Sequence, residues 1–316
     1  MRKKLGKSVL IAALALVMLA GLKFATARPR PDKPYLVSDR PLVMAHRGAS
    51  GLAPENTLVA FRKALEAGAD VLELDVHATE DGQVVVIHDE TVDRTTDGHG
   101  PVGAMTLRQL KALDAGAWMD QEFAGERIPT LREALALMRG RVQVSIDLKA
   151  GSEVYPGIEA RVATLVREMG CLDEVIVMAE DCAVIQRMRC LEPGLRTACY
   201  RYQALRLRCA VGQECHGGYV FVWPEELSSS LIRRAHSRGW KVITSLERRA
   251  VEEPAEMRRL ARLGVDGILS NHIGLLVRTL TELDDEEEQE RRFESPRHLG
   301  GGAAGPPGQR LPQGGQ

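Results

Sequence analysis

The sequence predicts an α/β fold of the TIM type, a (β/α)8 barrel formed by a single domain between residues 41 and 280. Short runs rich in Val and Ile alternate with amphipathic helical stretches, and this pattern indicates a parallel sheet. No GxGxxG segment follows the first predicted strand. Because the length also suits one barrel, a closed barrel is favoured over an open Rossmann sheet.

Nine segments have the composition of strands, one more than the barrel requires: residues 42–45, 71–76, 84–87, 142–146, 175–178, 196–199, 219–222, 241–244 and 267–269. The second and third are separated only by a short turn with Asp81-Gly82. This turn is typical of a hairpin and too short for a helical crossover. Either one of these two segments is an antiparallel arm, or a weaker candidate is not a strand.

Helices are predicted at residues 57–67, 131–138, 157–168, 228–237 and 253–263. Thr57 and Thr130 occupy N-cap positions, and glycines follow four helical stretches: Gly68, Gly170, Gly239 and Gly264. Residues 91–125 form a long insertion rich in Gly and charged residues. Loops of this length usually serve a site.

The two ends of the chain are predicted to lie outside the barrel. Residues 1–27 join a basic head to an uncharged apolar run, which predicts a cleaved signal peptide or a retained N-terminal membrane anchor. Residues 28–40 are interpreted as a linker, and residues 281–316, acidic and then rich in Gly and Pro, as a disordered tail. The basic head favours the cytoplasmic side. We therefore expect an exported domain that is membrane-anchored, periplasmic or extracellular.

The composition excludes some partners. A formal net charge of -1 and an aromatic content of 4% argue against nucleic acid. All six cysteines lie in one segment: Cys171, Cys182, Cys190, Cys199, Cys209 and Cys215. In an exported chain this clustering predicts disulfides of open pairing, with a zinc site as the alternative.

Polar residues gather at the ends of the first two predicted strands. His46 and Arg47 end the first strand, where barrel sites form. On the second, the alternation of side chains places Glu73, Asp75 and His77 on one face. Two buried carboxylates are costly without a counter-ion, and a divalent cation with oxygen ligands meets that need. A solvated face of an edge strand is the alternative.

Two further strand ends extend this set. With Asp81 and Gly82 as the two central hairpin residues, Asp75 is predicted to face His88 on the same side of the hairpin. Asp147 and Lys149 share a face at the end of another strand. A surface ion pair is the alternative for these last two residues.

Together these residue types suit the hydrolysis of a phosphodiester. Arg47, Lys149 and a metal can clamp the negative charge of the phosphate. The side chains of His46 and His88 can accept a proton from the nucleophile and donate one to the leaving oxygen. The metal adds charge stabilisation and positions the substrate.

The motifs His46-Arg47-Gly48, Pro54-Glu55-Asn56-Thr57, Glu73-x-Asp75 and His88-Asp89 resemble the signature of the glycerophosphodiester phosphodiesterase family. The resemblance implies a TIM-type barrel with the long insertion after the second histidine. It implies His46 and His88 as acid and base, and Ca²⁺ or Mg²⁺ at Glu73, Asp75 and Asp147. The implied reaction releases glycerol 3-phosphate and an alcohol from a glycerophosphodiester. Lysophospholipids are further expected substrates if the N-terminal segment stays in the membrane.

Some positions depart from the family pattern. Asp147 stands where Glu is usual, Asn271 where Asp is common, and residues 243–246 differ from an expected Trp-Thr-x-Asn motif. The alternatives are lysophospholipase D, phospholipase C or sphingomyelinase D-like action on membrane lipid, and a non-catalytic exported domain that binds lipid headgroups.

Overall fold

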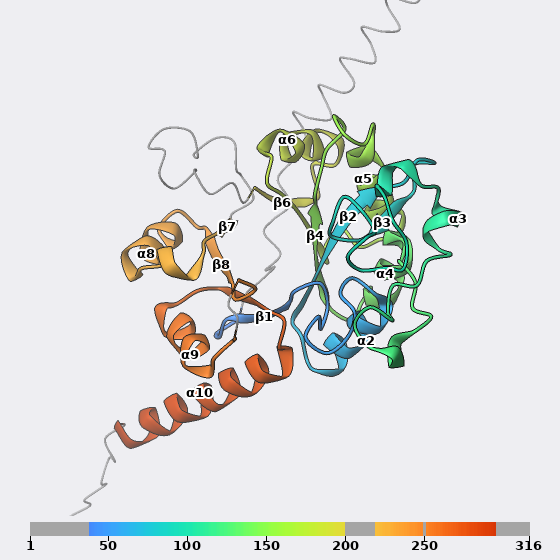
Figure 1. Ribbon diagram of the computed structural model, residues 1–316. Helices are drawn as coiled ribbons and strands as arrows, with labels where there is room; N and C mark the ends of the chain where they lie inside the picture. Colours follow the sequence, from blue (N-terminus) through green and yellow to red (C-terminus); the bar gives the residue numbers. More distant parts are fainter. Residues whose placement is uncertain (1–37, 200–218, 249–250, 295–316) are drawn as a thin grey trace, which may run out of the picture.

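The computed structural model describes residues 38–199, 219–248 and 251–294 (Figure 1). Eight parallel strands follow one another in the order β6-β5-β4-β2-β1-β9-β8-β7, and the end strands β6 and β7 lie beside each other. The sheet is thus a nearly closed barrel, which confirms the predicted fold class. The strands are β1 (Leu42–Ala45), β2 (Val71–Ala78), β4 (Gln143–Leu148), β5 (Val175–Ala179), β6 (Arg196–Cys199), β7 (Tyr219–Phe221), β8 (Lys241–Ser245) and β9 (Gly267–Ser270).

Helices alternate with these strands and surround the barrel (Figure 1). The predicted N-caps are confirmed, because the hydroxyls of Thr57 and Thr130 accept backbone hydrogen bonds at the starts of α2 and α4. The helices are α2 (Leu58–Glu66), α4 (Leu131–Met138), α5 (Ile158–Glu168), α6 (Cys182–Leu191), α8 (Ser229–His236), α9 (Pro254–Leu263) and α10 (Ile273–Glu294), and the 3₁₀ turn η4 (Pro224–Glu226) precedes α8.

The ninth strand, β3 (Val84–Val86), is the antiparallel arm and pairs with β2. The predicted hairpin register is wrong by one residue, since Val76 pairs with Val86. The loop has three residues, 80–82, instead of two, and Gly82 closes it with a positive φ of 76°. Asp75 therefore does not face His88 across the hairpin.

The insertion after His88 has a small apolar core of its own. It contains η1 (Val102–Ala104), α3 (Leu107–Leu110) and η2 (Gln121–Phe123). Its buried side chains pack with two residues of the arm, Val85 and Ile87, in one cluster with Val92, Val102, Leu110, Ala115 and Ile128. The insertion is therefore built on the β3 arm.

Apolar side chains line both faces of the barrel sheet. The larger cluster joins outward-facing residues such as Val43 and Leu72 to the helices. A second cluster joins inward positions of several strands: Leu42, Met44, Val71, Ile176, Met178, Ala198, Ile243 and Leu269. Because side chains alternate, the inward row of β1 continues from Met44 to His46. The inward positions thus change from apolar to polar toward the C-terminal strand ends, where barrel enzymes place their sites.

The predicted disordered tail is wrong for residues 281–294, because α10 continues through the acidic run to Glu294. Leu280 and Leu283 are buried, and Arg258 of α9 forms an ion pair of 3.0 Å with Glu286. Helically spaced leucines on one face and a cationic partner on the neighbouring helix explain why this acidic segment is ordered.

The described residues leave other predictions about the chain untested. The signal or anchor segment and residues 295–316 lie outside them, and no described helix is long and apolar enough to cross a membrane.

The thiols of Cys171 and Cys190 are free, so the predicted disulfides do not include these two residues. Cys209 and Cys215 lie outside the described residues.

Candidate active site

The ends of β2 and β4 bring the three predicted metal ligands together. The two strands pair with Asp75 beside Asp147, and Glu73 occupies the preceding inward position on β2. One oxygen from each carboxylate lies within 4.8 Å of the others, and all three residues are buried. They form one acidic group at the C-terminal end of the barrel.

Lys149 and Arg47 bring positive charge to this acidic group. Lys149 Nζ lies 2.8 Å from Asp75 Oδ1 and 2.6 Å from Asp147 Oδ2. Arg47 Nε lies 3.4 Å from Asp75 Oδ2. Burial raises the pKa of Asp75, but the charges of Lys149 and Arg47 outweigh burial and hold that pKa far below its ordinary value. Asp75 is therefore ionised at neutral pH.

The donor set fits a hard divalent cation such as Mg²⁺ or Ca²⁺, which takes oxygen ligands. Three buried carboxylates face the two cationic side chains named above. Burial and the adjacent charge of Asp75 raise the pKa of Glu73, whose carboxylate accepts a hydrogen bond from the Arg47 backbone N–H at 2.8 Å. A cation held by this group would stabilise the ionised form of Glu73.

Arg47 reaches the acidic group because the backbone turns sharply after β1. Arg47 itself has a φ of 54° and Gly48 a φ of 80°, a region that side-chain-bearing residues rarely adopt. A Cβ at Gly48 would lie 2.9 Å from the backbone of Ala60, so only glycine allows α2 to pack this closely. The guanidinium of Arg47 also donates to Glu55 Oε1 at 2.9 Å.

Asn56 fixes the orientation of Asp75. Its backbone also has a positive φ, 57°. Its Nδ2 donates to Asp75 Oδ2 at 2.7 Å, and its Oδ1 accepts from the Asp75 backbone N–H at 3.3 Å. Glu55 and Asn56 belong to the motif Pro54-Glu55-Asn56-Thr57, but no role was predicted for either side chain.

His46 lies beside Glu73, at one side of the acidic group. Its Nδ1 is 2.8 Å from Asn271 Oδ1, and its Nε2 is 2.6 Å from Glu247 Oε2. Because both partners are acceptor oxygens, both ring nitrogens donate and the ring is a cation. Burial lowers the pKa of His46, but the bond to Glu247 and the charge of Glu73 raise it to about 9.

Asn271 is itself held in place by several groups. Its backbone N–H donates to Glu252 Oε1 at 2.8 Å, and the Ser50 hydroxyl donates to its Oδ1 at 2.8 Å. These contacts orient the amide oxygen toward His46. Glu247 and Glu252 were not predicted, because no motif marks the loop after β8.

His88 lies close enough to Asp75 for an electrostatic interaction between the two side chains. Its Nδ1 is 2.6 Å from Asp89 Oδ1. The carboxylate accepts, so Nδ1 carries the proton and Nε2 is the nitrogen that can exchange protons with a substrate. The side chain is 30% exposed, compared with 9% for His46, so His88 is the more accessible histidine.

His77 shares the inward face of β2, as predicted, but does not join the acidic group. Its Nε2 donates to the backbone carbonyl of His88 at 2.9 Å, and its Nδ1 accepts from the Tyr155 hydroxyl at 2.9 Å. Burial lowers the pKa of His77, which keeps the ring neutral. His77 therefore supports the backbone that carries His88.

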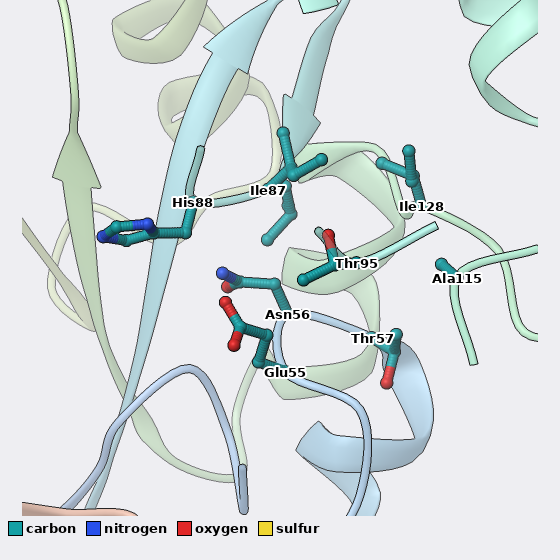
Figure 2. A pocket seen from close by; sticks show the side chains of 9 residues that line it. Glu55, Asn56, Thr57, Ile87, His88, Thr95, Ala115 and Ile128 are labelled. Atoms are coloured by element: carbon teal, nitrogen blue, oxygen red, sulfur yellow. The ribbon is translucent and has the colours of Figure 1, made fainter. Parts of the chain in front are cut away.

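A pocket lies between the insertion and the loop before α2 (Figure 2). Its polar part is formed by Glu55, Asn56 and His88, and its apolar part includes Ile87 and Ile128. In Figure 2 the side chains of Glu55 and Asn56 lie next to each other, and the His88 ring points away from Ile128. The pocket therefore borders the second histidine and Asn56, which donates a hydrogen bond to Asp75 of the acidic group.

Comparisons with known proteins agree with this geometry. Residues 46–275 match the model of the glycerophosphoryl diester phosphodiesterase family. A glycerophosphodiester phosphodiesterase of Caldanaerobacter subterraneus subsp. tengcongensis is 38% identical over 239 residues, which cover 73% of this chain and 93% of that protein. A glycerophosphodiester phosphodiesterase of Bacillus subtilis is 32% identical over 282 residues, with 83% and 94% covered.

Solved structures show the same likeness. The glycerophosphodiester phosphodiesterase of Agrobacterium tumefaciens superposes with a TM-score of 0.67 at 32% identity and covers 75% of this chain and 99% of its own. A phosphodiesterase of Oleispira antarctica, in complex with the product sn-glycerol-3-phosphate, has a TM-score of 0.64 at 25% identity, with 77% and 97% covered. This chain belongs to the glycerophosphoryl diester phosphodiesterase family and is an enzyme of that family.

Proposed function

We propose that this protein hydrolyses glycerophosphodiesters to glycerol 3-phosphate and an alcohol, with a divalent cation held by Glu73, Asp75 and Asp147. The observation that carries the proposal is the buried acidic group with His46 near Glu73 and His88 near Asp75. The product complex of the Oleispira relative supports the same reaction. When bound, the cation supplies positive charge that stabilises the charge developing on the phosphoryl oxygens.

Arg47 and Lys149 bind the phosphate in this proposal. Both cationic side chains contact Asp75. Arg47 presents a planar fork that suits phosphate oxygens, whereas Lys149 acts as a mobile point charge. Together they orient the diester toward the two histidines.

The two histidines divide the proton transfers. His46 is held as a cation by Asn271 and Glu247, so it is the group that can donate a proton to the leaving alcohol. His88 has its Nδ1 proton fixed by Asp89, which leaves Nε2 to accept a proton from the attacking nucleophile.

Release of glycerol 3-phosphate by the purified full-length protein tests the proposal. Glycerophosphocholine, glycerophosphoethanolamine and lysophosphatidylcholine are each assayed with Mg²⁺, with Ca²⁺ and with excess chelator. Cation-dependent release from the water-soluble diesters is expected. Absence of glycerol 3-phosphate from both water-soluble diesters with either cation would overturn the proposal. Turnover confined to lysophosphatidylcholine, measured as release of lysophosphatidic acid and choline, would move the substrate to membrane lipid.

We also propose that residues 1–27 direct export of the barrel domain. The support is the basic head, which includes Arg2 and Lys7, followed by the uncharged apolar run. Fractionation of cells that express the full chain, with N-terminal sequencing of the product, checks this proposal. A product in the cytoplasm that retains residues 1–27 would contradict it.

A further inference from the structure

The guanidinium of Arg94, in the insertion, joins two carboxylates that each hold a different part of the site. Its Nε and Nη2 donate to Asp89 at 2.7 and 3.0 Å. Its Nη1 and Nη2 donate to Glu55 at 2.8 and 2.7 Å. Both edges of the planar group are therefore engaged, in the bidentate geometry that arginine favours with carboxylates.

Each of these two carboxylates has its own partner in the site. Asp89 accepts from His88 Nδ1 at 2.6 Å, and Glu55 accepts from the Arg47 guanidinium at 2.9 Å. A continuous chain of hydrogen bonds thus runs from His88 through Asp89, Arg94 and Glu55 to Arg47. It connects the β3 arm to the loop after β1.

Arg94 also explains how the partly buried carboxylates of Glu55 and Asp89 remain charged. The Glu55 side chain is only 12% exposed, and burial by itself raises its pKa, but Arg94 and Arg47 lower it below the ordinary value. The Arg94 guanidinium and, less strongly, the His88 ring lower the pKa of Asp89 to about 2. Both carboxylates are therefore ionised and keep their bonds to the site residues.

We propose that Arg94 is a positioning residue that holds His88 and Arg47 at a fixed separation. The proton acceptor, His88, and the phosphate-binding residue, Arg47, can then act on the same bound substrate. This inference rests on the proposed function, which gives His88 and Arg47 their roles. Arg94 itself touches neither residue in the hydrogen bonds described, and it acts through Asp89 and Glu55.

A separate variant tests each half of this chain of hydrogen bonds. Asp89→Asn weakens the hold on His88, so it is expected to lower kcat about 10- to 100-fold with little change in KM, because the proton transfer alone is affected. Glu55→Gln weakens the hold on Arg47 and is expected to raise KM more than it lowers kcat. Arg94→Ala should show both defects, and Arg94→Lys an intermediate loss, since an ammonium cannot bridge two carboxylates bidentately.

The experiment measures kcat and KM for glycerophosphocholine, with the activating cation, in full-length wild type and these variants. Arg132→Ala is the matched control, because Arg132 forms an exposed ion pair with Glu168 on the outer helices. Urea unfolding of every variant separates positioning from stability. Addition of guanidinium ion at low millimolar concentration is expected to restore part of kcat to Arg94→Ala and none to Asp89→Asn.

Two results would overturn the inference. One is Arg94→Ala with kcat and KM within about twofold of Arg132→Ala. The other is a loss of activity that follows the unfolded fraction in both Arg94 variants. If Arg94→Ala does not fold, Arg94→Lys decides: wild-type kinetics refute the bridge, and a lower kcat at an unchanged urea midpoint supports it. Failure of the proposed function is distinct, because the wild type would then release no glycerol 3-phosphate.

Discussion

His46 Nε2 lies 2.6 Å from Glu247 Oε2, and this contact sets the protonation state of the proposed acid. The pKa of His46 is raised to about 9, so the ring is charged at lower pH and loses its proton as the pH rises through that value. Activity should therefore fall on the alkaline side. A cation bound at Glu73 offsets part of that carboxylate's charge, so the fall in the loaded enzyme should lie at or below pH 9.

Glu247→Gln should move this alkaline limb to lower pH, because the substitution removes the negative charge that stabilises the imidazolium. The measurement is the pH dependence of kcat for both proteins. Glu287→Gln, at an exposed position of α10, serves as the control. An unchanged limb in Glu247→Gln would show that Glu247 does not control the proposed acid.

Cation binding should release a proton from Glu73. Burial and Asp75 raise the pKa of Glu73, so part of this group is protonated near neutral pH without a cation and must ionise to bind one. Titration calorimetry with Mg²⁺ or Ca²⁺ in two buffers of different ionisation enthalpy measures the released protons. Equal heats in both buffers, or the same release in Glu73→Gln, would contradict the assignment.

Asp75→Ala should abolish cation-dependent turnover, because it removes a metal ligand and the partner of both Arg47 and Lys149. The cation should also no longer raise the Tm, since a ligand stabilises a protein only by binding its native state. Asp285→Ala, on the exposed side of α10, is the control. Near-normal activity with normal cation dependence would remove Asp75 from the site.

His88→Ala should lower kcat by about 10²–10⁴-fold while KM changes little, which is the range for loss of a general acid or base. His99 provides a matched control in the same insertion, because its side chain is 86% exposed. His99→Ala should behave like wild type. A kcat for His88→Ala equal to that of the control would rule out a role in proton transfer.

Leu280→Ala tests the packing of α10 on the barrel. Leu280 is 1% exposed, so truncation should reduce the free energy of unfolding by about 2–5 kcal/mol. Glu287→Ala, on the same helix and exposed, should change it by less than about 0.5 kcal/mol. Urea unfolding measures both. Similar midpoints would mean that this helix does not pack in solution as described.

The barrel could be predicted because its strands are short β-branched runs whose pattern depends on local sequence alone. β1 was predicted at its observed bounds. The short turn predicted that residues 71–76 or residues 84–87 form an antiparallel arm, or that a weaker candidate is not a strand, and the structure shows that β3 is the arm. The register failed at Gly82, where one extra loop residue in a left-handed conformation shifts every pair. Sequence pattern does not distinguish a two-residue from a three-residue loop here.

Alternation along β2 predicted that Glu73 and Asp75 share a face, and the family resemblance added Asp147 as the third expected metal ligand; the structure brings the three carboxylates together. Roles for Glu247, Glu252 and Arg94 could not be predicted, because each has at least one partner distant in sequence and stands among ordinary charged residues. For example, Ser270 and Asn271 bind Glu252 across 18 and 19 positions. Such pairings depend on how the loops pack together at the C-terminal end of the barrel. The periodicity of hydrophobic residues in the sequence does not encode this packing.

Arg47 and Asn56 both hold a left-handed backbone conformation that their side chains disfavour. Such positions cost of order 1–3 kcal/mol each, less for asparagine, and persist only where surrounding contacts impose them. Glycine at either position would relieve that cost and remove a group that contacts Asp75. Selection for stability alone would therefore favour glycine at these two positions, which would remove side chains that contact Asp75. The present sequence keeps both contacts at a cost in the free energy of unfolding.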